Sequence, residues 1–224
     1  MSALTIDLCE EPEHIIFLLG PPGIGKGTLG KRFAAESGFY HLSVGDHLRE
    51  LASHCDFLSI KPMEDTTRNV IGLNIDDRIR IRQSQLLDSE VLMPLLKRQM
   101  NKIMKKEDGT KNFLIDGFPR SIDQAQAFAK FATPDLILTL SCPRPAVRKR
   151  FLERTLRNRP PETAGKFEER YEEYLRNRRE IEEWYNAGKV NIVEVDCTGD
   201  IESNYEALKG AIEKGMGGLL AKEN

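Results

Sequence analysis

The sequence predicts an α/β domain in which helices cover both faces of a largely parallel β-sheet. Short apolar runs at residues 15–19, 39–42, 112–115, 136–140 and 190–195 have the length of strands, and segments with helical periodicity separate them. Strands that alternate with helices run parallel, because each crossover returns the chain to the same end of the sheet. The 224 residues, 40% hydrophobic and 30% charged, are enough for one core and a small additional lobe.

Composition excludes several functional classes. The net charge of −2 predicts no affinity for nucleic acid through bulk electrostatics, and no apolar run approaches the roughly 20 residues that cross a membrane. The four cysteines are widely spaced and no signal sequence is recognisable, so we expect reduced thiols and a cytoplasmic or nuclear location. Residues 1–13 and 215–224 are expected to be loose termini around a single domain at 14–214.

The first strand leads into a glycine-rich segment with the spacing of a phosphate-binding loop. Gly20 is followed after four residues by Gly25 and Lys26, and a helical pattern begins there. Glycines let the backbone curl so that N–H groups point inward at a polyphosphate, and Lys26 adds a mobile positive charge for the outer phosphates. The candidate nucleotide-binding residues of this loop are Gly20, Pro21, Gly23, Ile24, Gly25, Lys26, Gly27 and Thr28.

Two further segments resemble one enzyme family. The run from His41 to Arg49, HLSVGDHLR, is similar to the segment that opens the acceptor-binding lobe of nucleoside monophosphate kinases, the adenylate and UMP/CMP kinases. The run Asp-Gly-Phe-Pro-Arg at 116–120 follows an apolar strand and is a signature of the same family. The resemblance covers about residues 15–214 and implies a P-loop three-layer α/β/α fold. It also implies an acceptor-binding helical lobe at about 43–88 and a short lid at about 156–165.

The resemblance assigns roles around the acceptor. Arg49 and Arg120 would grip the acceptor phosphate, while Asp46 and Asp116 would order Mg²⁺ through water. Because Gly27 stands where many phosphate loops carry a Ser or Thr ligand, the metal is expected on phosphates, water and these carboxylates. The residues assigned to the acceptor are Ser43, Val44, Arg49, Leu86, Leu87, Gly117, Arg120, Gln124, Arg159 and Arg170. Leu86 and Leu87 could equally be packing leucines.

The donor side is assigned in the same way. Arg150 would pack on the ATP adenine, Arg154 would contact the ATP phosphates, and backbone at Gly199 would face the adenine. The lid arginines Arg159 and Arg170 would close on the transferring phosphoryl group and exclude water. The residues expected to act in catalysis are therefore Lys26, Arg120, Arg154, Arg159 and Arg170.

The acceptor base is left open between two possibilities. Gln124 matches the glutamine that reads adenine in adenylate kinases, where UMP/CMP kinases usually carry asparagine. Val44 stands where adenylate kinases tend to have threonine and pyrimidine kinases alanine. The sequence thus favours AMP, with UMP or CMP as the alternative.

Three segments fit the family less well or carry no site. Arg159 is followed by Pro160, Pro161 and Glu162 where the family commonly has aspartates, which leaves open a regulatory nucleotide-binding module with little turnover. Residues 51–83 appear as an insertion whose alternating Arg-Ile run at 78–82 predicts either a half-exposed strand or the end of a basic helix. The helix expected at 166–187 has an apolar side of core residues, namely Phe167, Tyr171, Tyr174, Leu175, Ile181, Trp184 and Tyr185.

The expected function is a monomeric nucleoside monophosphate kinase. It would move the γ-phosphoryl group of Mg·ATP to a nucleoside monophosphate. No side chain is needed as a general base, because the oxygens of the acceptor phosphate are already nucleophilic. Catalysis would then consist of alignment and charge stabilisation.

Overall fold

A five-stranded parallel sheet, in the order β2-β3-β1-β4-β5, forms the centre of the molecule. The computed structural model describes residues 11–58, 72–106, 109–154 and 162–217. The strands are β1 (His14–Leu19), β2 (Tyr40–Ser43), β3 (Asn112–Asp116), β4 (Leu136–Ser141) and β5 (Asn191–Asp196). The expected parallel α/β fold is confirmed, and each predicted strand is present to within a residue or two.

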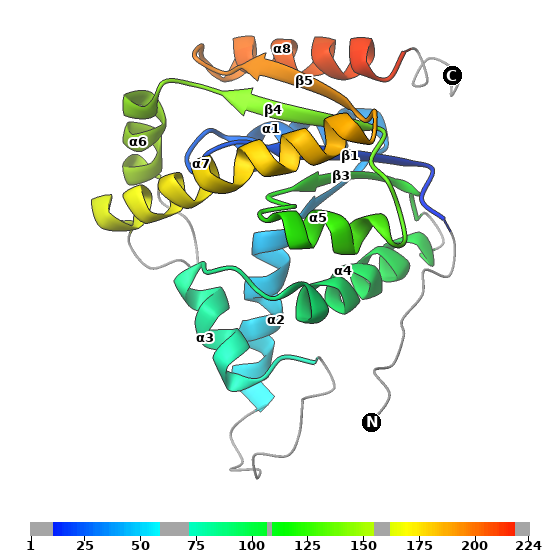
Figure 1. Ribbon diagram of the computed structural model, residues 1–224, viewed down its shortest axis with the longest axis vertical. Helices are drawn as coiled ribbons and strands as arrows, with labels where there is room; N and C mark the ends of the chain where they lie inside the picture. Colours follow the sequence, from blue (N-terminus) through cyan, green and yellow to red (C-terminus); the bar gives the residue numbers. More distant parts are fainter. Residues whose placement is uncertain (1–10, 59–71, 107–108, 155–161, 218–224) are drawn as a thin grey trace.

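The helices lie in two layers around this sheet (Figure 1). They are α1 (Lys26–Ser37), α2 (Val44–Leu58), α3 (Ile75–Gln83), α4 (Ser89–Met104), α5 (Ile122–Ala129), α6 (Arg144–Glu153), α7 (Ala164–Ala187) and α8 (Ile201–Gly215). Helices α1 and α8 pack on one face of the sheet, and α4, α5 and much of α7 pack on the other. Helices α2 and α3 extend away from the sheet past its β2 edge, at the bottom of Figure 1.

Alternation along the central strand accounts for the two layers. Successive side chains of a strand point to opposite faces, so a strand that is buried on both sides is apolar throughout. Ile15 and Phe17 of β1 belong to the core shared with α4, α5 and α7, whereas Ile16 and Leu18 belong to the core shared with α1 and α8. The apolar run at the start of the chain thus becomes the central strand that carries the phosphate loop at its carboxyl end.

Two open or incorrect expectations are resolved here. The arginine-rich run at 78–82 is helical, in α3, where Asn74 and Asp77 form a capping box that fixes the start of the helix. The prediction that Leu175 belongs to the apolar side of α7 is wrong, because this side chain is 45% exposed. Phe167, Ile181 and Tyr185 of the same helix are buried as expected. At 3.6 residues per turn, Leu175 lies about 90° round the helix from these residues, at the edge of the side that faces the core.

No helix in the described part of the chain is long and apolar enough to cross a bilayer. The expected lid at 156–165 falls largely outside the described residues, as does all of 59–71 within the expected insertion.

Candidate active site

The phosphate loop joins β1 to α1 and is packed against α6. Gly25 caps the start of α1 with a φ of 105°, and Lys26 is the first residue of that helix. Gly23 has a φ of 88°, and a Cβ atom placed there would lie 2.4 Å from the Val147 carbonyl oxygen and 2.8 Å from the Phe151 Cβ. Only glycine satisfies both the backbone conformation and this close approach. The glycine spacing read from the sequence therefore reflects a loop held tightly on the underlying helix.

Lys26 lies within the curl of this loop. Its Nζ donates hydrogen bonds to the carbonyl oxygens of Gly20 at 2.7 Å and Pro21 at 3.1 Å. Burial lowers the pKa of Lys26 from 10.5 to about 8; the Asp116 carboxylate opposes this shift, and nearby arginines add to it. Because the protein compensates the buried positive charge of Lys26 only in part, a phosphate group is expected to bind there favourably.

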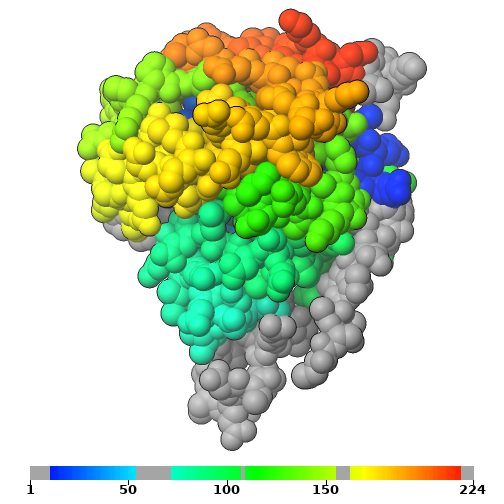
Figure 2. Space-filling model, viewed as in Figure 1, coloured from blue at the N-terminus to red at the C-terminus, as the bar shows by residue number. Residues whose placement is uncertain are grey.

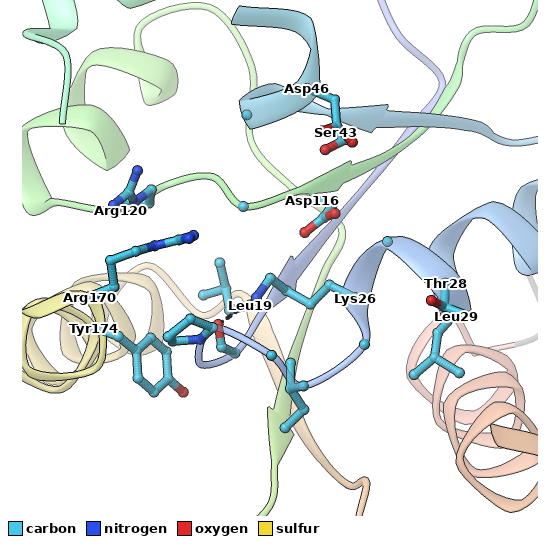
Figure 3. Close-up of a pocket in the computed structure, with 18 of the residues that line it drawn as sticks. Leu19, Lys26, Thr28, Leu29, Ser43, Asp46, Asp116, Arg120, Arg170 and Tyr174 are labelled. Carbon is cyan, nitrogen blue, oxygen red and sulfur yellow. Dashed lines mark hydrogen bonds between the residues drawn. The ribbon is translucent and has the colours of Figure 1, made fainter. Parts of the chain in front are cut away.

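A cleft of about 1250 Å³ opens beside the loop, at the carboxyl ends of the parallel strands. Its walls come from the loop, α2, the end of α3, α7 and the start of α8. Figure 3 shows Lys26, Asp116, Arg120 and Arg170 converging on one space, with Ser43 and Asp46 on its far side. The volume exceeds the roughly 300–1,000 Å³ of a pocket for one small ligand, so two nucleotides can be accommodated.

Most of the predicted site residues line this cleft. Those that do are Gly20, Gly23, Ile24, Gly25, Lys26, Gly27, Thr28, Ser43, Asp46, Arg49, Asp116, Gly117, Arg120, Arg150, Arg154, Arg170 and Gly199. Pro21, Val44, Leu86, Leu87 and Gln124 do not line it, and Arg159 lies outside the described residues. Val44 and Leu87 are buried in the core, so their side chains contribute packing in this conformation.

Arg120 is held by two partners from distant parts of the chain. Its NH2 donates to the Glu173 carboxylate of α7 at 2.6 Å and to the Ser84 carbonyl oxygen, at the end of α3, at 3.3 Å. Sequence reasoning did not identify Glu173. A signal was available, since Glu173 follows Arg170 by three residues on one helix and such pairs share a helical face.

Other arginines of the cleft also have acidic partners. Arg49 NH2 donates to Asp46 within the first turns of α2. Arg154 NH2 donates to Glu162, and the same carboxylate lies 3.8 Å from Arg170 NH1. The Glu162 side chain is only 10% exposed, so it is enclosed between these two arginines. Carboxylates therefore lie beside guanidinium groups that the resemblance assigns to phosphates.

Arg150 fixes the loop between β5 and α8. Its guanidinium donates to the carbonyl oxygens of Cys197 at 2.8 Å, Thr198 at 3.3 Å and Gly199 at 3.0 Å. Asn204 donates to two of the same carbonyls, those of Cys197 and Gly199. The backbone expected to face the donor adenine is thereby tied to the arginine expected to stack on it.

Asp116 ends β3 at the floor of the cleft and is 6% exposed. The His41 Nε2 lies 3.5 Å from its carboxylate on the side away from the cleft. Among the residues that the structure describes, no cluster of three or more His, Cys, Asp or Glu side chains could hold a metal by itself.

Gln124 is the site residue whose placement differs most from expectation. Its Oε1 accepts a hydrogen bond from the Arg120 backbone N–H at 2.9 Å, and its Nε2 donates to the Leu87 carbonyl oxygen at 3.1 Å. The residue is 3% exposed. Its amide therefore joins the turn after β3 to the segment before α4, and the reading of a base by Gln124 stays a prediction.

A curled glycine loop at the end of the central strand, with a cation-lined cleft beside it, places this chain in the class of P-loop nucleotide-binding proteins. Comparison with known proteins then defines the family. The family model described as "Adenylate kinase" matches residues 18–190. This chain belongs to the adenylate kinase family and is an ATP:nucleoside monophosphate phosphotransferase.

Individual relatives divide between two acceptor classes. The chain is 30% identical over 207 residues to a UMP-CMP kinase of Danio rerio, covering 90% of this chain and 97% of that protein. It is 28% identical over 221 residues to a uridylate kinase of Saccharomyces cerevisiae, covering 96% and 99%. It is also 32% identical over 202 residues to adenylate kinase isoenzyme 5 of Mus musculus, covering 89% of this chain but 32% of the mouse protein.

Proposed function

We propose that this phosphotransferase moves the γ-phosphoryl group of Mg·ATP to a pyrimidine nucleoside monophosphate, UMP or CMP. This reverses the preference for AMP that Gln124 suggested in the sequence. The observation that carries the proposal is the engagement of the Gln124 amide by Leu87 and Arg120. The names of the fish and yeast relatives, which match this chain over nearly their whole length, support the same acceptor class.

The argument from Gln124 rests on hydrogen-bond capacity. Reading a purine edge requires the amide to donate and accept toward the ligand. Here one N–H group and one lone pair of the amide are used by Leu87 and the Arg120 N–H, and the residue is buried and does not line the cleft. Turning the amide toward a ligand would break these bonds and leave buried backbone groups without partners. Such a loss costs about 1–3 kcal/mol for each group. A purine would have to compensate for that cost, whereas a smaller base recognised by other groups would not.

We assign the remaining roles from position in the cleft. Lys26 and the loop backbone would hold the β- and γ-phosphates of ATP, and Arg150 would present its face to the donor base. Arg49 and Arg120 would bind the acceptor phosphate. Arg154 and Arg170, with Arg159 of the undescribed lid, would neutralise charge as the phosphoryl group moves.

The residues present fit a magnesium ion that is held mainly by the nucleotide. Carboxylate and phosphate oxygens and water are the ligands that Mg²⁺ prefers. Asp116 is buried beside the loop, and a Cβ atom at Gly27 would lie 3.8 Å from its Oδ2, so this carboxylate faces the start of α1. Asp116 would hold the ion through water, with Asp46 across the cleft. The ion would screen the phosphate charge.

The test is a panel of acceptors with the purified chain. UMP, CMP, AMP, GMP and dCMP would each be supplied with Mg·ATP, and ADP formation would be followed. We expect kcat/KM for UMP or CMP to exceed that for AMP by about tenfold or more, a size typical of discrimination by a few contacts. A preference for AMP would contradict the proposed acceptor, and an absence of turnover with every acceptor would support the binding module.

A pair of variants addresses Gln124 directly. If its amide is structural, Gln124→Ala lowers the melting temperature and weakens all acceptors alike. If it reads a purine, the loss is confined to AMP and GMP. Gln126→Ala is the matched control, because Gln126 lies on the exposed side of the same helix and should change neither property.

A further inference from the structure

Glu173 places a negative charge on the wall of a cleft that is built for polyanions. It projects from α7, lines the cleft, and its side chain is 20% exposed. Its carboxylate accepts a hydrogen bond from Arg120 NH2 at 2.6 Å. Neither the resemblance nor the proposed roles of the site residues use this acid. A carboxylate in this place repels phosphate groups that enter the cleft, so its presence there needs a functional explanation.

The contact blocks a particular part of Arg120. A guanidinium binds phosphate bidentately through one of two edges, Nε with NH2 or NH1 with NH2, and both edges include NH2. That nitrogen has two hydrogens, and it donates to both Glu173 and the Ser84 carbonyl oxygen. An acceptor phosphate can therefore bind Arg120 bidentately only after it displaces one of these partners.

We propose that Glu173 is a specificity-determining residue of the acceptor site, which competes with the acceptor phosphate for Arg120. The inference rests on the proposed role of Arg120 as a ligand of that phosphate. A phosphate dianion attracts a guanidinium more strongly than a carboxylate monoanion does, so a nucleoside monophosphate displaces Glu173 at the cost of some affinity. Weakly charged ligands do not, and Glu173 keeps the site closed to them.

The same contact joins separate parts of the cleft wall. Through Arg120, the end of α3 at Ser84 is linked to α7, and the space-filling view shows α7 (yellow) directly above α3 (teal) on one face (Figure 2). Arg170 lies one turn before Glu173 on α7 and lines the same cleft. When an acceptor binds and displaces Glu173, the hydrogen bond that connects α7 to Arg120, and through it to the end of α3, is therefore broken.

The experiment compares Glu173→Gln with the wild-type chain. Glutamine keeps the shape of the side chain and removes its charge. Dissociation constants for UMP and AMP would be measured by calorimetry, in the absence of ATP, and for ATP in the absence of an acceptor. We expect the acceptor dissociation constant to fall about three- to tenfold, the range for a partly buried ion pair, and the ATP constant to stay within about twofold.

The matched control is Glu172→Gln. Glu172 neighbours Glu173 on α7 but pairs with Arg144 outside the cleft, at 3.1 Å, and should leave every constant unchanged. Acceptor binding that is unchanged or weaker in Glu173→Gln, with an unaltered melting temperature, would overturn the proposal. Weaker binding would mean that Glu173 orients Arg120 and does not compete with the phosphate.

A second arm separates this inference from the proposed function. Arg120→Met should weaken acceptor binding, and in that background Glu173→Gln should strengthen it by less than in the wild-type chain, because the competition for Arg120 is gone and only direct charge repulsion remains. If Arg120→Met leaves acceptor binding intact, the proposed role of Arg120 is wrong. If Arg120→Met weakens acceptor binding but Glu173→Gln has no effect in the otherwise wild-type chain, the proposed competition is wrong and the proposed role of Arg120 stands. UMP and AMP share the phosphate, so an error in the acceptor base does not affect this comparison.

Discussion

Binding of ATP should cause Lys26 to take up a proton, by an amount that depends steeply on pH. In the free chain, burial holds the pKa of Lys26 near 8, below its ordinary 10.5. About half of the lysine is then neutral at pH 8, and about a tenth at pH 7. The triphosphate of ATP supplies compensating negative charge, and this favours the protonated form.

The expected amount follows from the two protonation states. The free chain loses the Lys26 proton as pH rises through about 8, while the ATP complex keeps it to higher pH. If ATP restores the pKa to its ordinary value, the complex takes up about 0.5 proton per ATP at pH 8 and about 0.1 at pH 7. ATP affinity should accordingly fall as pH rises above about 8.

Calorimetric titration in buffers of different ionisation enthalpy measures this uptake. The comparison is Lys26→Arg, whose side chain stays charged throughout this range and has no proton to gain. Lys26→Met, which has no titratable group, should behave in the same way at weaker affinity. The terminal phosphate of ATP titrates near pH 6 and contributes about equally to all three proteins. Wild-type uptake that does not rise from pH 7 to pH 8, or that equals the Lys26→Arg value at pH 8, would refute the reasoning.

Two further predictions concern packing and the donor site. A Cβ atom at Gly30 would lie 2.6 Å from the His41 ring, so Gly30→Ala should lower the free energy of unfolding, measured by urea denaturation, by about 1–2 kcal/mol. The control is Gly210→Ala, which has open space around it and should be neutral or slightly stabilising. No loss in Gly30→Ala would show that the ring moves freely. In Arg150→Lys a single nitrogen replaces the planar fork whose two terminal nitrogens reach the three carbonyls, so KM for ATP should rise about tenfold with KM for the acceptor unchanged. An equal change in both KM values would contradict a donor-specific role.

The sheet and the phosphate loop could be predicted because their signals are local. A strand that is buried on both faces must be apolar along its length, as at Ile15 to Leu19, and a loop that curls around phosphate needs glycine at fixed spacing. Both requirements act within a few residues of sequence. The resemblance to nucleoside monophosphate kinases supplied most of the other site residues, and the structure brings most of them to one cleft.

The counter-ions of the arginines could not be predicted in the same way. Glu173 meets Arg120 across 53 positions of sequence, and only the tertiary packing of α7 against α5, the helix that follows Arg120, brings them together. Gln124 matched a family position, but its amide is satisfied by backbone groups whose placement no local pattern specifies. The prediction that Leu175 is a core residue was wrong because α7 carries apolar residues over more of its circumference than the core covers.

The central claim is that the cleft transfers phosphoryl between two nucleotides. The most direct measurement is to supply ATP labelled on its γ-phosphate, with magnesium and UMP, and to separate the products after partial conversion. The account predicts that the label appears in the β-phosphate of UDP, with little in inorganic phosphate, because the closed site excludes water. Label that accumulates in inorganic phosphate, at a rate that does not depend on the acceptor, would contradict it.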